Sequence, residues 1–99
     1  PVPPAVAAVP SVSDVLNDRG ERYGLFIDQA EISQQLKLHI QVQLEKRDKH
    51  LVHDQQEALD MICLKIARII NGDADYVDSW VDIAGYAQLV VDRLRGTPR

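Results

Sequence analysis

The sequence predicts an all-α fold, a compact bundle of three main helices preceded by a short N-terminal helix. Three observations predict it. Apolar residues recur at helical spacing along residues 28–94, polar residues typical of helix starts precede each run, and residues 54–94 contain neither proline nor an alternating strand pattern. The 99 residues suit one domain, which we expect over residues 11–96.

The first ten residues stand apart from this domain. They hold Pro1, Pro3, Pro4 and Pro10 in a run of alanine and valine without helical or strand period. We expect residues 1–10 to form an extended or disordered Pro/Ala tail.

Each expected helix has its own start and stop signals. Ser11 or Ser13 can cap a short helix over residues 11–22, and a second helix runs from Asp28 to about residue 46. A third spans residues 54–71 and ends at Gly72, where a left-handed residue is expected. The fourth opens over residues 75–78 and closes near residue 96. The short connection makes the last two helices an antiparallel hairpin.

Both hairpin helices have an apolar stripe and, opposite it, a mixed face. The stripes comprise Leu59, Ile62, Cys63, Ile66, Ile69 and Ile70 on the first helix, and Trp80, Ile83, Ala84, Ala87, Val90, Val91 and Leu94 on the second. On the mixed faces, charges alternate with apolar residues such as Met61 and Leu89. Leu38 and Val42 form a further apolar strip on the second helix. We therefore expect burial on both sides of the hairpin and a homo-oligomer.

Composition narrows the class of protein. The formal net charge is −4 with a pI near 5.2, and this argues against nucleic-acid binding because a basic face is missing. No run of about 18 apolar residues predicts a membrane span. Cys63 lies on an apolar stripe, which indicates a small core residue in a reducing compartment, the cytoplasm.

Four carboxylates are candidates for a metal site. Glu57 and Asp60 on the third helix, with Asp78 and Asp82 on the fourth, can converge across the hairpin, and magnesium prefers hard oxygen ligands. A simpler interpretation stands beside it: Glu57 and Asp78 fit helix caps, and all four can be solvated charges.

Basic and aromatic residues offer the other candidate contacts. Lys65 and Arg68 can bind phosphate oxygens. Tyr23 and Tyr86 can stack on a base or serve in packing, whereas Trp80 is expected as a packing anchor. Gly85, inside a helix, costs about 1 kcal/mol relative to alanine, so we expect another backbone or a ligand to approach it.

Several segments together resemble a family of small tailed-phage proteins. The resemblance covers residues 19–92 and rests on Arg22-Tyr23-Gly24, Glu57-Ala58-Leu59-Asp60-Met61-Ile62, Lys65-Ile66-Ala67-Arg68-Ile69, Gly72-Asp73 and Asp78-Ser79-Trp80-Val81-Asp82-Ile83-Ala84-Gly85-Tyr86. That family is distantly similar to the all-α, MazG-like nucleotide pyrophosphohydrolases. The resemblance implies a nucleotide pocket between helices, magnesium, and dimers or tetramers of helical hairpins. The enzymes' Glu-Glu-x-x-Glu motif shrinks here to Glu57-x-x-Asp60, and their Glu-x-x-Asp becomes Asp78-x-x-x-Asp82.

Three functional hypotheses follow. The first is a phage-encoded, magnesium-dependent nucleoside triphosphate pyrophosphohydrolase in the host cytoplasm. The second is a non-catalytic oligomer that sequesters a nucleotide, such as a signalling nucleotide of a host defence system. The third is a structural or protein-binding module whose mixed faces are subunit interfaces.

Overall fold

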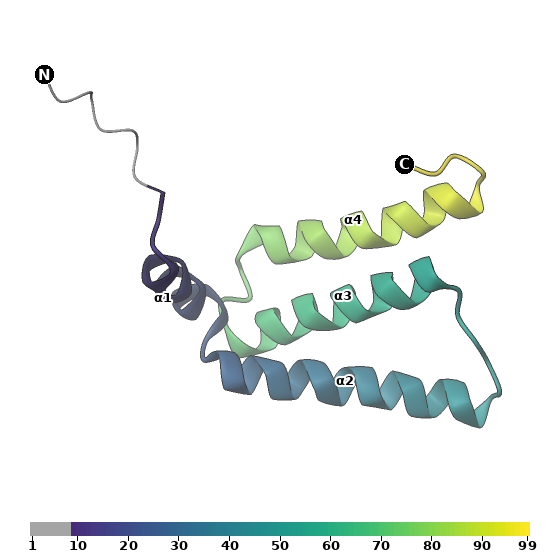
Figure 1. Ribbon diagram of the computed structural model, residues 1–99, viewed down its shortest axis with the longest axis horizontal. Coiled ribbons are helices and arrows are strands. Elements are labelled where there is room, and N and C mark those ends of the chain that lie inside the picture. Colours follow the sequence, from purple (N-terminus) through teal and green to yellow (C-terminus); the bar gives the residue numbers. More distant parts are fainter. Residues whose placement is uncertain (1–8) are drawn as a thin grey trace, which may run out of the picture.

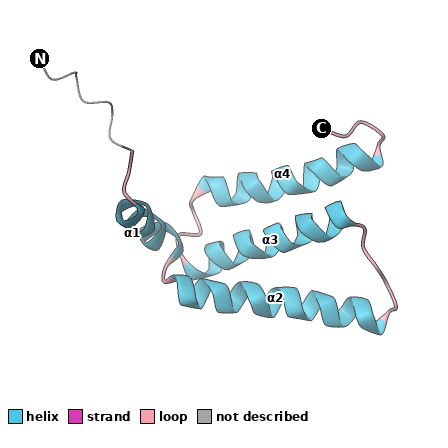
Figure 2. Ribbon diagram, viewed as in Figure 1, coloured by secondary structure: helices cyan, strands magenta, loops and turns pink. Residues whose placement is uncertain are grey.

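The computed structural model describes residues 9–99, and four helices account for most of them (Figure 2). They are α1 (Val12–Tyr23), α2 (Phe26–Lys46), α3 (His53–Asn71) and α4 (Val77–Leu94). Residues 9–99 contain no strand, so the all-α prediction is confirmed. The tail expected at residues 1–10 falls mostly on residues 1–8, which lie outside the described residues.

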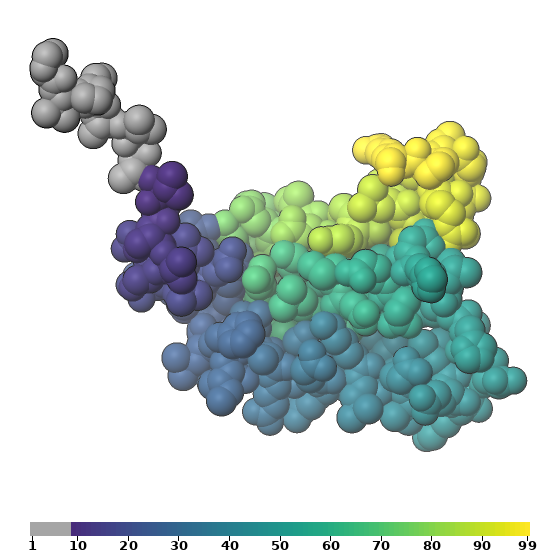
Figure 3. Space-filling model, viewed as in Figure 1, coloured from purple at the N-terminus to yellow at the C-terminus, as the bar shows by residue number. Residues whose placement is uncertain are grey.

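Helices α2, α3 and α4 lie side by side in one layer with α3 in the middle (Figure 1). Helix α3 packs on both neighbours, whereas α2 and α4 do not contact each other. Helix α1 crosses one end of the layer and contacts α2 and α3, and the space-filling view shows it set against that end (Figure 3). The predicted helical bundle and its hairpin of α3 and α4 are confirmed, and the three main helices are arranged as a layer in which α3 provides the packing on both sides.

The helix starts agree with the expected caps at α1 and differ from them at α2 and α3. The cap of α1 is as predicted, since Ser11 Oγ accepts from the Asp14 N–H at 3.1 Å. Helix α2 begins at Phe26, two residues before Asp28. At the start of α3, Gln55 Oε1 accepts from the Val52 N–H at 3.3 Å, and this leaves the Asp54 carboxylate available for a partner on another helix.

That partner is Arg93, near the end of α4. The Arg93 Nε lies 2.7 Å from Asp54 Oδ2 and its Nη2 lies 2.8 Å from Oδ1, a two-pronged ion pair that joins the open end of the hairpin. The hydrogen bond from Arg93 lowers the pKa of Asp54, and the same bond raises the pKa of Arg93.

At the closed end of the hairpin, two backbone segments cross in contact. A Cβ atom added at Gly72 would collide with the Arg22 carbonyl oxygen and Tyr23 Cα. The Asn71 side-chain amide donates to the Tyr23 carbonyl at 2.8 Å, and the Asp73 N–H donates to the Arg22 carbonyl at 2.6 Å. Gly72 has φ −132°, so the expected left-handed conformation is wrong. Glycine is needed there because the chain that enters α2 leaves no room for a side chain.

Burial is shallow throughout the described residues. The buried apolar residues are the small Ala58, Cys63 and Ala67, all on α3, and no large side chain is fully buried. Trp80 is 54% exposed and its Nε1 donates to the Ala74 carbonyl at 2.8 Å. The expectation that Trp80 anchors the core is therefore wrong, because α4 turns Ser79 toward the interior instead. None of the helices in the described part of the chain combines the length and apolar character needed to span a bilayer.

Replacing Gly72 with alanine should destabilise the fold. The added methyl group meets backbone atoms that cannot rotate away, so we expect Gly72→Ala to lower the free energy of unfolding by about 1–3 kcal/mol. Gly85→Ala is the matched control, because a Cβ there meets nothing within 4 Å, and it should raise the free energy of unfolding by about 0.5–1 kcal/mol. Urea unfolding monitored by circular dichroism measures both. Equal effects of the two changes would contradict this account of the crossing.

The Asp54–Arg93 pair should make the stability of the fold depend on pH in the acidic range. The folded-state pKa of Asp54 lies below the unfolded value, so the pair stabilises the fold above that unfolded value and loses its effect as pH falls through the folded pKa. We expect the difference in Tm between the wild type and Asp54→Asn to be largest near neutral pH and to narrow below about pH 4. Asp75→Asn, an equal change of charge in an exposed turn, should show no comparable narrowing.

Candidate functional site

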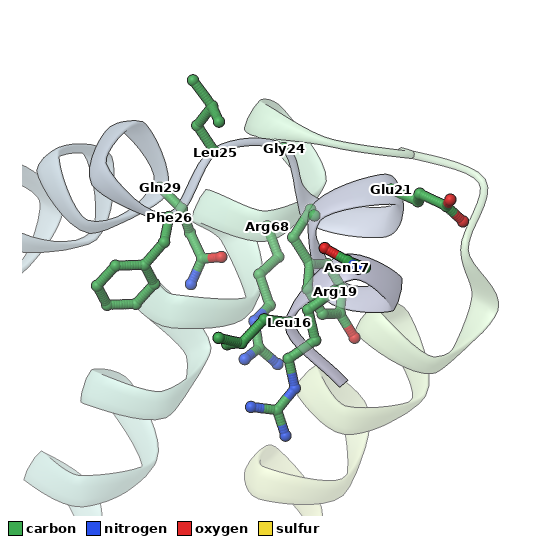
Figure 4. A pocket seen from close by; sticks show the side chains of 11 residues that line it. Leu16, Asn17, Arg19, Glu21, Gly24, Leu25, Phe26, Gln29 and Arg68 are labelled. Carbon is green, nitrogen blue, oxygen red and sulfur yellow. The ribbon is translucent and has the colours of Figure 1, made fainter. Parts of the chain in front are cut away.

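A large cavity lies where α1, the α1–α2 turn and α3 meet (Figure 4). Its volume is about 890 Å³. Apolar side chains contribute much of the lining, notably Leu16, Leu25 and Phe26. The charged side chains at its edge are two arginines, Arg19 and Arg68, and one carboxylate that Figure 4 shows pointing away from them, Glu21.

Arg68 is held in this cavity by Tyr23. Its guanidinium carbon lies 4.2 Å from the centre of the Tyr23 ring, a cation–π contact. The Asn71 hydrogen bonds and the crossing at Gly72 fix the backbone of Tyr23, so the ring that supports Arg68 is itself held in place. Sequence reasoning selected both residues separately, and the structure brings them together. Since Arg68 occupies the Tyr23 ring, Tyr23 positions a cation rather than presenting that surface to a base.

The two arginines of the cavity have no acidic partner within residues 9–99. All ion pairs found there involve other cations. The Arg68 Nε is shielded from solvent and makes no hydrogen bond. A shielded guanidinium N–H without an acceptor carries a desolvation cost, which an anion in the cavity would remove. The cavity thus has a net positive charge in a chain whose formal net charge is −4.

A second arginine–tyrosine pair extends the cluster toward α4. Arg22 lies 4.4 Å from the Tyr76 ring centre and its Nη1 donates to the Tyr76 hydroxyl, while the Tyr23 and Tyr76 rings meet edge to face at 6.0 Å. The Tyr76 hydroxyl donates to Asp78 Oδ2 at 2.7 Å. This hydrogen bond to Asp78, with burial, raises the pKa of Tyr76. Sequence reasoning missed Arg22 and Tyr76 as site residues, because no local spacing links α1 to the start of α4.

Lys65, predicted to bind phosphate, lies elsewhere and has its own partner. Its Nζ is 3.0 Å from Asp82 Oδ2, in a pair that joins α3 to α4. The Lys65 side chain is 12% exposed, so releasing it toward a ligand would leave Asp82 unpaired. Lys65 therefore joins α3 to α4 within the hairpin through its ion pair with Asp82.

The four carboxylates predicted to hold magnesium do not gather into one set of ligands. Within residues 9–99 there is no group of three or more His, Cys, Asp or Glu side chains placed to hold a metal ion. Asp60 accepts from Gln56 Nε2 at 3.1 Å, Asp78 accepts from Tyr76, and Asp82 pairs with Lys65. Glu57 is exposed. The single chain does not fit a magnesium ion at these positions.

Tyr86 and Gly85 lie on the mixed face of α4, beyond the cavity that holds Arg68. They line a shallow hollow of about 450 Å³ with Asp82 and Leu89. A Cβ at Gly85 would meet open space. The expected close approach of another backbone segment to this glycine is therefore not found within the described residues. The hollow has no cation–aromatic pair of the kind that distinguishes the Arg68 cavity.

Comparison with known proteins provides a family. A family model described as "Domain of unknown function (DUF6378)" matches residues 11–93. No curated protein and no solved structure matches the chain. The matched segment begins at the cap of α1 and ends within the last turn of α4, so it includes all the residues that line the cavity and all of the hairpin except Leu94. The chain belongs to this DUF6378 family.

Proposed function

We propose that the protein binds a nucleotide or a closely related phosphorylated small molecule in the cavity between α1, the α1–α2 turn and α3. One observation carries the proposal: Arg68 presents a guanidinium that is supported by Tyr23, partly shielded from water, and without an acidic partner among the described residues. A planar guanidinium with free N–H groups suits a phosphate oxygen pair.

The cavity offers complementary surfaces for the two ends of such a ligand. Arg19 and Arg68 supply positive charge for phosphates, and Figure 4 shows their guanidinium ends turned the same way. Leu16 and the 76% exposed Phe26 supply an apolar wall on which a base can pack. A volume of about 890 Å³ lies within the range typical of small-molecule sites.

Binding without catalysis is the form of the hypothesis that the geometry favours. Of the carboxylates that a magnesium-dependent pyrophosphohydrolase would use, Asp60, Asp78 and Asp82 each contact a different side chain and Glu57 is exposed. None of the four lines the cavity. We therefore propose a nucleotide-binding protein of the phage type suggested by the sequence resemblance, acting in a cytoplasm where such ligands are abundant.

Isothermal titration calorimetry with ribo- and deoxynucleotides tests the proposal. We expect at least one nucleotide to bind, and Arg68→Gln to weaken its Kd about tenfold or more, as loss of charged hydrogen bonds implies. Arg95→Gln is the matched control, because it changes net charge equally from an exposed position beyond α4, and it should leave the Kd unchanged. Absence of binding by every nucleotide at millimolar concentration, or equal effects of both changes, would refute the proposal.

The same titration separates binding from hydrolysis. Run with Mg²⁺ and with EDTA, it should give similar affinities, and chromatography of the denatured complex should return the nucleotide intact. Release of pyrophosphate only with Mg²⁺ would instead support the pyrophosphohydrolase hypothesis.

A further inference from the structure

Most residues of the apolar stripes predicted as core lie, half-buried or exposed, at one surface of the hairpin, whereas Cys63 is buried. We call this surface the hairpin face, and it comprises Leu59, Ile62, Ile66 and Ile70 of α3 with Trp80, Ile83, Ala84, Ala87, Val91 and Leu94 of α4. Ile70, Trp80 and Leu94 are 63%, 54% and 61% exposed. A layer one helix thick cannot cover both sides of α3, so residues with the spacing of a core remain exposed to water.

The middle of the hairpin face is hollowed. A cavity of about 340 Å³ runs between α3 and α4, and Gln55 provides its only polar side chain. Small residues, Ala58 and Ala87, lie in this groove, and the larger Leu59 and Ile62 flank it. Grooves of small residues beside ridges of large ones are the surfaces that a second pair of helices packs against.

We infer that the hairpin face binds the hairpin face of a second copy of this chain, forming a two-fold dimer with a four-helix core. Charge favours this occupant. No acidic or basic residue belongs to the face, although the chain has a net charge of −4, so two copies can meet there without placing like charges together. A charged partner would find nothing on the face to pair with.

The size of the face also suits a dimer. Helix α4 has 18 residues, which corresponds to a length of about 27 Å, and two helices at ordinary spacing are about 18 Å wide. The footprint is then about 500 Å² on each copy, and the two together reach the roughly 1,000 Å² expected of a specific interface. Burial of this face supplies the large apolar core that a single chain lacks.

The dimer leaves the proposed ligand cavity accessible. Arg68 lies about three turns after Glu57, so both are on the mixed face of α3. That face is separate from the hairpin face, because Glu57 lines one hollow and Leu59 of the hairpin face lines another. The inference therefore does not rest on the proposed function, and either can fail alone.

Light scattering coupled to size-exclusion chromatography tests the dimer at high-micromolar concentration. The wild type should elute with twice the chain mass of 11.1 kDa, and Ala87→Glu should elute with the mass of one chain. Ala87 is exposed in the single chain, so the glutamate charge should weaken the dimer interface more than it destabilises the fold. Ile70→Glu, on the other helix of the face, should act in the same way.

Leu38→Glu is the matched control. Leu38 is 64% exposed on α2, on the side away from α3, and its replacement by glutamate should leave the dimer intact. A monomeric wild type would overturn the inference and assign the face to another occupant. An oligomer that survives Ala87→Glu and Ile70→Glu but is lost in Leu38→Glu would overturn it too. Circular dichroism confirms that each variant retains its helices.

Discussion

The structure depends on one constraint, that α3 packs against a different helix on each of two opposite sides. Ala67 and Cys63 are small enough to let a neighbouring helix approach closely, and Ala58 serves the hairpin in the same way. Helices α2 and α4 do not contact each other, and among residues 9–99 only α1 lies across α3, at one end. The two remaining sides of α3 stay open, and the whole account of function concerns what covers them.

The open sides differ in chemistry, and the difference follows from the sequence of α3 and α4. The mixed face carries polar contacts between helices, such as Lys65 with Asp82. At its α1 end it carries Arg68 over Tyr23, with no acidic partner for Arg68 among residues 9–99. The hairpin face carries no charge. A polar ligand would supply the missing hydrogen-bond acceptor for Arg68. An apolar partner would remove Ile70 from water, so the two binding events would relieve different energetic costs.

Local sequence patterns predicted the helices and their short connection, whereas the packing between helices depends on long-range contacts that these patterns do not specify. Helical periodicity and the brief connection at Gly72 were enough for the four helices and the hairpin. Periodicity could not show that the stripe that begins at Trp80 would lack a neighbouring helix, because that depends on α2 lying beside α3 rather than over the hairpin. Similarly, Arg68 and Tyr23 were separate candidates, and their contact follows from the backbone crossing. Asp82 pairs with Lys65 across the hairpin, and residues 9–99 contain no group of three or more possible metal ligands.

We propose that this layer has two functional faces, one for a small phosphorylated ligand and one for a second chain. Native mass spectrometry of the gently purified protein, sprayed with added ATP, tests both parts in one spectrum. We expect two-chain ions with up to two bound nucleotides for the wild type, and loss of the nucleotide without dissociation of the chains for Arg68→Gln. Single-chain ions that retain no nucleotide would contradict it.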